Sequence, residues 1–485
     1  MSLRITATIL ILSFSTFLVR AQQTEAEQLR KQLKEATEKF DKILEEHRAT
    51  IQQLNRRLEV LENQSRAATN AAPAAANVAV AETAATPAVP PPSWFPTNPI
   101  RIASAGQNYI NLSFDGLFAA GSSTAYDIET LQRGAHDPKQ RGFTVQNLEP
   151  TFEGKVDPYF RGQATISMQL TPGGETTIEA EEAYAETMGL PWNLQIKGGT
   201  FFSEFGRINA THAHAWDFVD SPLVTTRLLG PDGLRNPGVR ASWLVPTPFY
   251  SEIFFAVQNA QGETAYSFDT DFGGAPFLGR RESQRGISSV GDLLFVPRYV
   301  ASFDLSDSQT VLAGASAAFG PNASGSHADT QIYGLDFFYK WKPVNHHGGF
   351  PFVGWQTEAM LRRFGAAESM SVDLNGDSVA DFVPGETLLD YGFYTQLIYG
   401  FRKGWVAALR GDFVTSDRAQ YEQLYGRDPE RATRWRISPD VTWYPSEFSK
   451  LRLQYNYDHR AGIGIDHSVW MQFEFLLGTH AAHKF

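Results

Sequence analysis

Two histidines are the first residues whose type and spacing suggest chemistry. His212 and His214 stand two positions apart in "THAHAW", in a chain that contains 11 histidines. Imidazole nitrogens at this spacing can share a metal ion on a strand or a turn. No carboxylate or further histidine lies at a diagnostic distance in the sequence. A metal site therefore competes with a pair of ordinary exposed loop histidines.

An acidic loop, "DLNGDSVAD", is a second candidate metal site. Its match to an EF-hand loop is imperfect, because Ser378 replaces the turn glycine and Pro384 replaces the bidentate glutamate. A shorter calcium-binding loop fits better, and a hydrated surface loop is the alternative. Structural Ca²⁺ is the one cofactor that the sequence suggests. The side chains at suitable spacings are Asp373, Asn375, Asp377 and Asp381.

Arginines gather in "RDPERATRWR", residues 427–436. On a strand, Arg434 and Arg436 would share one face and could place a positive stripe inside a barrel. A loop that binds sugars or phosphates, or simply solvated charge, is the alternative. Catalysis is not indicated, because His467 and Ser468 are adjacent on an expected strand and would face opposite sides. The sequence predicts that the protein is not an enzyme.

The elements that must position these residues are strands with one apolar and one polar face. In residues 160–170, "FRGQATISMQL", apolar or small residues alternate with polar ones without a slip. Residues 450–459, "KLRLQYNYDH", repeat the pattern. Successive side chains of a strand point to opposite faces, so each stretch is apolar on one side only. The polar residues of these two strands that we expect to line a lumen are Arg161, Gln163, Thr165, Ser167, Arg452, Gln454 and Asn456.

Composition favours a barrel in a membrane over a soluble sheet. Aromatic residues make up 13% of the 485 residues, cysteine is absent and the net charge is −11. The acidic balance argues against a nucleic-acid partner. In lipid, only a closed barrel leaves no unpaired strand edge. Residues 101–485 are therefore predicted to form an all-β transmembrane antiparallel β-barrel of about 16–18 strands around an aqueous channel, with a secreted soluble β protein as the alternative.

The N-terminal region divides into three further segments. Residues 1–21 have the charged start, apolar middle and small-residue end of a secretory signal peptide. Residues 24–64 carry heptad-like spacing that predicts a short α-helical coiled coil. Residues 65–100 are rich in alanine and proline and read as a tether. With an even number of strands the coiled coil would lie in the periplasm, where it would trimerise the barrel or hold it to peptidoglycan.

One stretch, "IEAEEAYAETMGLPWNLQIKGGTFFSEFGR", resembles a hallmark of the porin O/P group, the phosphate-selective-porin-like outer-membrane proteins. The matching features are the acidic and aromatic residues 182–186, Gly198–Gly199 and Phe205–Gly206. The blocks "HAHAWDFVDSPLV", "GVRASW" and "SKLRLQYNYD" are similar to that superfamily too. The resemblance implies a place in the outer membrane of a diderm bacterium. It also implies that Glu204, Arg207 and Asp217 lie at a constriction of the pore.

The predicted function is passive diffusion of small hydrophilic solutes or ions through a homotrimeric outer-membrane porin. Its partners would be the lipid bilayer and the solutes. One alternative is a TonB-dependent-like receptor for a metal or metal chelate, which would need a plug and a coupling box where this chain has a coiled coil and a tether. Another alternative is a barrel that anchors an envelope-tethering coiled coil.

Overall fold

The structure is a computed structural model that describes residues 100–105, 108–155, 157–270, 276–283, 285–374 and 376–478. These residues belong to one compact unit, Pro91–Phe485. The predicted signal peptide (1–21), the coiled coil (24–64) and the tether up to residue 99 lie outside the described residues.

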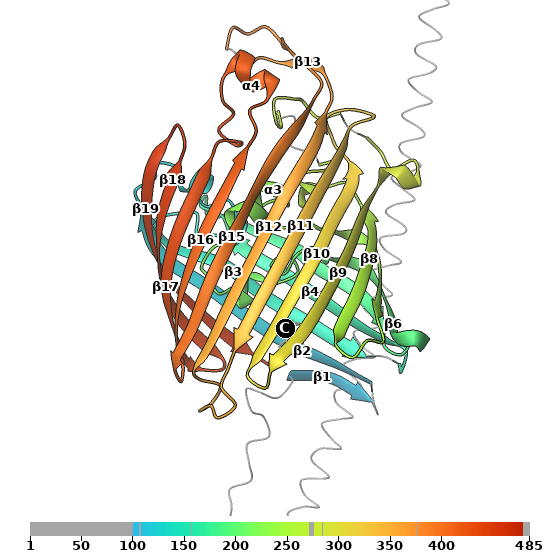
Figure 1. Cartoon of the computed structure of the whole chain (residues 1–485), viewed down its shortest axis with the longest axis vertical. Coiled ribbons are helices and arrows are strands. Elements are labelled where there is room, and N and C mark those ends of the chain that lie inside the picture. The colour runs from blue at the N-terminus through green and yellow to red at the C-terminus, as the bar shows by residue number, and fades with distance from the viewer. Residues whose placement is uncertain are drawn as a thin grey trace, which may run out of the picture. The chain divides into compact units, whose positions relative to one another are not determined.

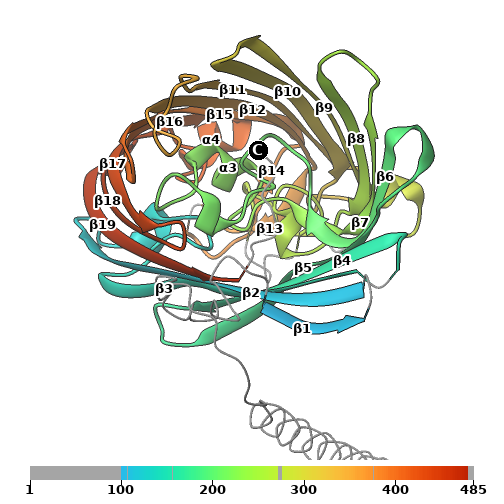
Figure 2. The ribbon, with the colours of Figure 1, turned by 90° about the horizontal axis from the view of Figure 1, so that it is seen from below.

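Sixteen antiparallel strands close into a barrel, within the 16–18 predicted. Each strand pairs with the next along the chain, and β19 pairs with β2 to close the ring seen end-on in Figure 2. Closure leaves none of these strands with a free edge. The sixteen are β2 (Asn108–Ser123), β3 (Gly142–Lys155), β4 (Phe160–Leu170), β5 (Thr176–Thr187), β6 (Leu194–Phe202), β7 (Arg235–Leu244), β8 (Tyr250–Asn259), β9 (Leu293–Ser306), β10 (Gln309–Pro321), β11 (Asp329–Trp341), β12 (Phe352–Ala366), β15 (Glu386–Arg402), β16 (Trp405–Ser416), β17 (Arg434–Ser446), β18 (Ser449–Arg460) and β19 (Gly464–Leu477).

The other elements are short. Strand β1 (Ile100–Ala105) pairs with β2, and β13 (Ser369–Val372) pairs with β14 (Asp381–Val383) in a separate hairpin. In the described part of the chain, no helix has the length and apolar character needed to cross a membrane. The helices are α2 (Ile128–Leu131), α3 (Leu223–Leu228) and α4 (Gln420–Tyr425), with 3-10 turns η1 (Pro191–Asn193), η2 (Ala213–Ala215), η3 (Glu263–Ala265) and η4 (Val290–Asp292).

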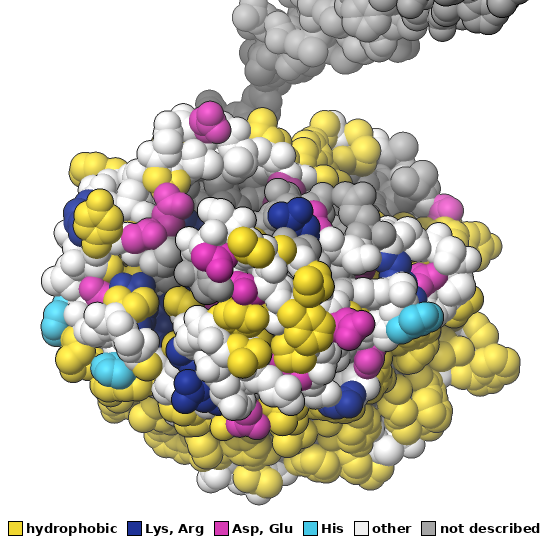
Figure 3. Space-filling view, turned by 90° about the horizontal axis from the view of Figure 1, so that it is seen from above, with side chains coloured by type: hydrophobic (Ala, Val, Ile, Leu, Met, Phe, Trp, Pro, Cys, Tyr) yellow, Lys and Arg dark blue, Asp and Glu magenta, His cyan; other side chains and the backbone are white. Residues whose placement is uncertain are grey.

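The predicted alternation of the strands is confirmed. On β19, Met471 is 54% exposed on the outside, whereas its neighbours Gln472 and Trp470 are buried inside. Leu335, at the middle of β11, is 66% exposed. Figure 3, seen from the end with the long connections, shows hydrophobic side chains crowded along the flank and a mixture of polar, charged and hydrophobic ones on the end. The ring is therefore apolar outside and largely polar inside.

Connections at the two ends of the barrel differ in length (Figure 1). At one end β9 and β10 are joined by residues 307–308, and β17 and β18 by residues 447–448. At the other end the connections include residues 203–234, 367–385 and 417–433. Because the strand number is even, β2 begins and β19 ends at the end with the short turns.

Residues 203–234, between β6 and β7, do not stay at the rim. This stretch, called the inner segment here, lies within the ring of strands and carries η2 and α3 (Figure 2). Its apolar residues pack on inward-facing residues of the wall, so the expectation of a purely watery interior is wrong for this part of the barrel. The sequence did not predict this packing, because α3 is too short to show a helical period. The cluster includes Phe201, Phe205, Leu223, Val224, Leu228, Leu229, Ala256, Val296, Ile332, Met360 and Val414.

Candidate functional site

The inner segment is fixed at its start by the opposite wall of the barrel. The backbone N–H groups of Arg207 and Ile208 donate to the Glu358 carboxylate at 3.0 and 2.8 Å. Gly206 has a φ of 60°, and a Cβ there would lie 2.1 Å from Glu358 Oε2. A side chain at this position would therefore be strained and would displace the carboxylate, which explains the glycine.

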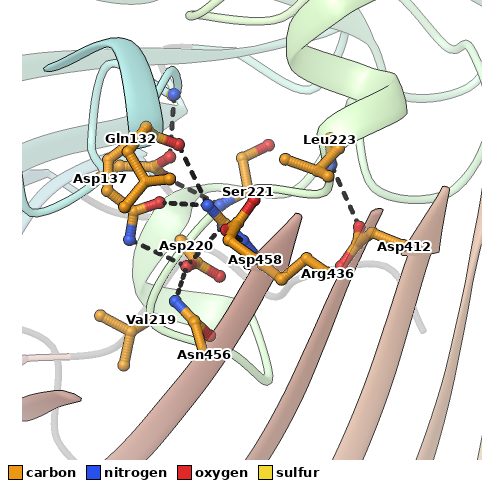
Figure 4. A network of polar contacts seen from close by, with 12 residues as sticks. Gln132, Asp137, Val219, Asp220, Ser221, Leu223, Asp412, Arg436, Asn456 and Asp458 are labelled. Atoms are coloured by element: carbon orange, nitrogen blue, oxygen red, sulfur yellow. Dashed lines mark hydrogen bonds and ion pairs between the residues drawn. The ribbon is translucent and has the colours of Figure 1, made fainter. Parts of the chain in front are cut away.

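Asp220 is the centre of a second attachment (Figure 4). Its carboxylate accepts hydrogen bonds from Arg410 on β16 at 2.5 Å and from Arg436 on β17 at 2.8 Å. Gln454 and Asn456 on β18 donate to the same carboxylate at 3.0 and 2.8 Å. Burial alone would raise the pKa of Asp220, but the positive charges of Arg436 and Arg410 and the hydrogen bonds from Gln132 and Gln454 hold it below its usual value.

Wall side chains also satisfy the backbone around Asp220. Val219 N–H donates to Gln454 Oε1 at 2.7 Å. Leu223 N–H donates to Asp412 Oδ1 at 3.1 Å (Figure 4). The second contact places a carboxylate at the first residue of α3, where helix N–H groups have no partner within the helix. The inner segment is thus held to the barrel wall by hydrogen bonds along its length.

The predicted lining residues of β18 face the interior but lie beneath the inner segment. Arg452 donates to the Trp216 carbonyl at 2.9 Å, and both Gln454 and Asn456 are buried. On β4, Thr165 and Ser167 are also buried, in hydrogen bonds to Thr151 and Asn147 on β3.

The remaining predicted lining residues contact side chains of the barrel wall. Arg161 is exposed and pairs with Glu186, and Gln163 accepts from the Tyr184 hydroxyl at 3.0 Å. Glu204 lies 3.4 Å from Arg240. Arg207 stacks over the Phe338 ring at 4.1 Å.

His212 and His214 are brought together with a glutamate that the sequence did not point to. Glu149 Oε1 lies 3.0 Å from His212 Nδ1, and Glu149 Oε2 lies 3.3 Å from His214 Nδ1. All three side chains are buried, so the expectation of exposed loop histidines is wrong for this pair. Glu181 and Glu182 on β5 also contact His212, at 3.1 Å to Nδ1 and 3.0 Å to Nε2.

A β-bulge explains why two consecutive glutamates face inward. In the pairing of β4 with β5, Thr165 is opposite Glu182 and Ile166 is opposite Ala180, which leaves Glu181 as the extra residue. Bulges re-aim side chains and are common next to functional sites. The two consecutive glutamates, Glu181 and Glu182, interrupt the alternation of the strand, and this interruption is the sequence signal that could have predicted the bulge.

The histidines of this region sit among negative charges. Burial alone would lower the pKa of His212, but the charges of Glu149 and Glu181 and their hydrogen bonds raise it well above its usual value. His214 shows the same balance, with Glu149 as the main cause of a raised pKa. His136, also buried, has its pKa raised to about 9 against the effect of burial by the hydrogen bond and charge of Glu181.

The acidic loop lies in the hairpin of β13 and β14. Asp373 accepts from the N–H groups of Gly376 and Ser378, both at 2.7 Å, and Asp381 accepts from Leu374 N–H at 2.9 Å. Asp377 accepts from Val379 N–H at 2.8 Å. Asn375 lies outside the described residues. These carboxylates stabilise the turn itself, and the calcium site stays a prediction.

Arg434 and Arg436 face the interior, as one interpretation of the sequence predicted. Both form ion pairs with the same carboxylate, that of Asp458. Near them lies a cavity of about 150 Å³, lined by residues of α3, β16 and the long connections. Arg227 of α3 contributes to its lining, and burial lowers the pKa of Arg227 to about 10. Its Nη2 donates to the Ala432 carbonyl at 2.9 Å, whereas Nη1 makes no hydrogen bond to a described residue.

Comparison with known proteins gives a relative but no family. No family model matches the chain. An uncharacterized protein of Aquifex aeolicus (strain VF5) is 29% identical over 406 residues, which is 78% of this chain and 79% of the relative. The resemblance to the porin O/P group therefore stays a prediction.

Solved structures of outer-membrane proteins are among those to which the chain is similar. The outer membrane channel DcaP of Acinetobacter baumannii has a TM-score of 0.49 and 14% identity over 76% of this chain and 97% of that chain. An anion-selective porin from Comamonas acidovorans has a TM-score of 0.47 and 7% identity, over 76% and 100%. A trimer form of OmpT of Vibrio cholerae has a TM-score of 0.45 and 8% identity, over 76% and 99%. At these values no role of this protein follows from the likeness.

Proposed function

We propose that this protein is an outer-membrane channel of the porin type, which lets small hydrophilic solutes or ions diffuse through a narrowed lumen. The observation that supports it most is the closed ring with apolar residues outside and charged residues inside. A closed ring satisfies every backbone hydrogen bond of its strands in lipid. Inward polar groups replace part of the hydration of a passing solute.

The inner segment would set the size limit of this channel. It touches β12 through Glu358 and β16 to β18 through Asp220, so it extends between distant parts of the wall. A lumen narrowed in this way suits ions and small solutes. The proposal involves no catalytic step and no cofactor.

Planar lipid bilayers offer the direct test. We expect small stepwise currents from the purified full chain, and larger steps when residues 205–232 are replaced by a short Gly-Ser turn. Ser203 N–H donates to the Leu234 carbonyl at 2.9 Å, so the two ends of the inner segment are adjacent and a short turn can join them. Phe202 and Arg235 are paired across β6 and β7, so the barrel register should survive the replacement.

The outcomes separate the candidate functions. If neither the full chain nor the shortened variant gives a current, while heat-modifiable migration on gels shows that both are folded, the pore proposal is wrong and the envelope anchor is favoured. Current from the shortened protein alone would mean that the natural barrel is closed, as the receptor alternative requires.

Charge selectivity can be tested at the cavity near α3. Substituting Arg227→Gln removes a half-buried positive charge from its lining, so the reversal potential in a salt gradient should shift towards cations. Arg418→Gln, an exposed arginine on the same end of the barrel, is the matched control and should leave the potential unchanged.

Assembly and location belong to the same proposal and rest on the sequence. The heptad spacing of residues 24–64 supports a coiled coil, which would lie in the periplasm and either trimerise the barrel or hold it to peptidoglycan. The mass of the detergent-solubilised protein, with and without residues 24–64, tests this: loss of the trimer on truncation supports it, and a monomer in both forms contradicts it.

A further inference from the structure

The inner wall of β2, β3 and β5 carries a concentration of carboxylates that the barrel alone does not explain. Asp115 and Glu149 are directly opposite each other in the pairing of β2 with β3, and both are buried. Like charges at directly opposed positions destabilise a sheet. With Glu181 and Glu182, four buried carboxylates surround the place where the inner segment inserts its histidines.

Asp115 is the most telling of the four. Its side chain is 1% exposed, and neither of its oxygens accepts a hydrogen bond from a described residue. Its Oδ1 lies 4.0 Å from His214 Nδ1. A buried carboxylate without donors is costly unless a positive charge lies next to it. The charge of Lys450 also acts on Asp115, but this lysine forms an ion pair with Glu474.

The donor atoms have the spacing of a metal site. One atom each from Glu149, His212 and His214 lies within 4.8 Å of the others. A zinc ion with bonds of about 2.0–2.1 Å would hold its ligands roughly 3.4 Å apart, so small rotations would complete the site. Glu181, at 3.1 Å from His212 Nδ1, can supply a fourth ligand.

The contacts around these donor atoms also suit a metal site. His212 Nε2 lies 3.0 Å from Glu182 Oε2, while its Nδ1 faces Glu149 and Glu181. A carboxylate that accepts from the far nitrogen of a histidine fixes the ring and its tautomer, as in carboxylate–histidine–zinc arrangements. Glu182 is itself held, because Phe202 N–H donates to its other oxygen at 3.2 Å.

We propose that Glu149, His212 and His214, with Glu181, bind one divalent transition-metal ion of the zinc class, which joins the inner segment to the barrel wall. Imidazole with carboxylate suits Zn²⁺, whereas Mg²⁺ and Ca²⁺ prefer oxygen ligands alone. The site rests on the geometry of the inner segment and does not depend on whether the barrel conducts.

Titration of the purified, metal-stripped full chain in detergent with ZnCl2 alone is the test. We expect one Zn²⁺ per chain and a Co²⁺ complex with visible absorption, unaffected by excess Mg²⁺ or Ca²⁺. His214→Gln and Glu149→Gln should each weaken Zn²⁺ binding by at least about 10-fold, as the loss even of an outer partner does. Heat-modifiable migration on gels would show that both variants are folded.

The double substitution His346→Gln/His347→Gln is the matched control, because it removes two adjacent histidines that are exposed in the β11–β12 connection. It should leave Zn²⁺ binding unchanged. Binding that falls in this control but not in His214→Gln would overturn the proposal. So would the absence of saturable Zn²⁺ binding, which would mean that imidazolium ions rather than a metal balance the carboxylates. Channel currents are a separate measurement, so either proposal can fail alone.

Discussion

At the scale of single residues, the stability of the interior depends on the pairing of each buried charge with an opposite charge or a hydrogen-bond donor. Asp220 illustrates this most clearly, since its carboxylate accepts hydrogen bonds from two arginines and two amides on three different strands and from the amide of Gln132. A buried charge whose partner is removed is left without compensation, which is far more costly than the loss of a surface ion pair. The sensitive positions are therefore the carboxylates of the inner segment and not the many exposed acids.

The substitution Asp220→Asn should destabilise the folded barrel by roughly 3–5 kcal/mol, because Arg410 and Arg436 would lose their shared counter-charge. The measurement is the urea concentration at which the heat-modifiable folded band disappears. Asp307→Asn, in the exposed turn between β9 and β10, is the control and should unfold like the natural protein. Equal midpoints for the two variants would contradict the prediction.

The same carboxylate predicts a dependence of stability on pH. The pKa of Asp220 is lowered in the folded barrel, so its contribution is fully present above the unfolded value of about 3.9 and is lost as the pH falls through the lower folded value. The gap in urea midpoint between the natural protein and Asp220→Asn should be constant from pH 7 to about pH 5 and shrink below about pH 4. A gap that widens in acid would contradict this sign.

At the scale of elements, α3 is held against the wall of the barrel by apolar packing. Leu228 is fully buried in the cluster that joins α3 to the wall. Its replacement should release the inner segment without opening the ring, because the strand pairing does not involve it. Local opening of this kind is expected where one element can detach while the rest stays folded.

Leu228→Ala should weaken the docking of α3 by roughly 2–5 kcal/mol through lost burial and the cavity left behind. We expect faster proteolysis within residues 203–234 and noisier single-channel currents. Leu424→Ala, at an exposed position of α4, removes the same atoms and should change neither readout. Similar cleavage of both variants would argue against a role of this packing in holding α3.

At the scale of the whole molecule, the apolar flank should face lipid. Leu335→Arg would place a charge near the middle of β11, at a cost of roughly 2–4 kcal/mol at the bilayer midplane. The folded fraction after insertion into vesicles, followed against urea, should fall accordingly. Leu424→Arg, outside the ring, should insert normally, and equal insertion of both variants would contradict a lipid-facing flank.

The strands could be predicted from the sequence because their signal is local. In β4, β18 and β19 each residue reports its own face through a period of two. The inner segment could not, because its partners lie far along the chain: Glu358 is 151 residues from Arg207, and Asn456 is 236 residues from Asp220. His212 and His214 were visible as a pair, whereas Glu149, 65 residues from His214, joins them only when the barrel closes.

The even number of strands has a practical consequence for work on living cells. A reporter fused ahead of β2 and another fused after β19 would emerge into the same compartment, next to the short turns. An epitope inserted into residues 417–433 would emerge into the opposite one. Intact cells should therefore bind an antibody to that insertion while shielding both fusions, so the way the chain is threaded through the envelope can be read without purifying the protein.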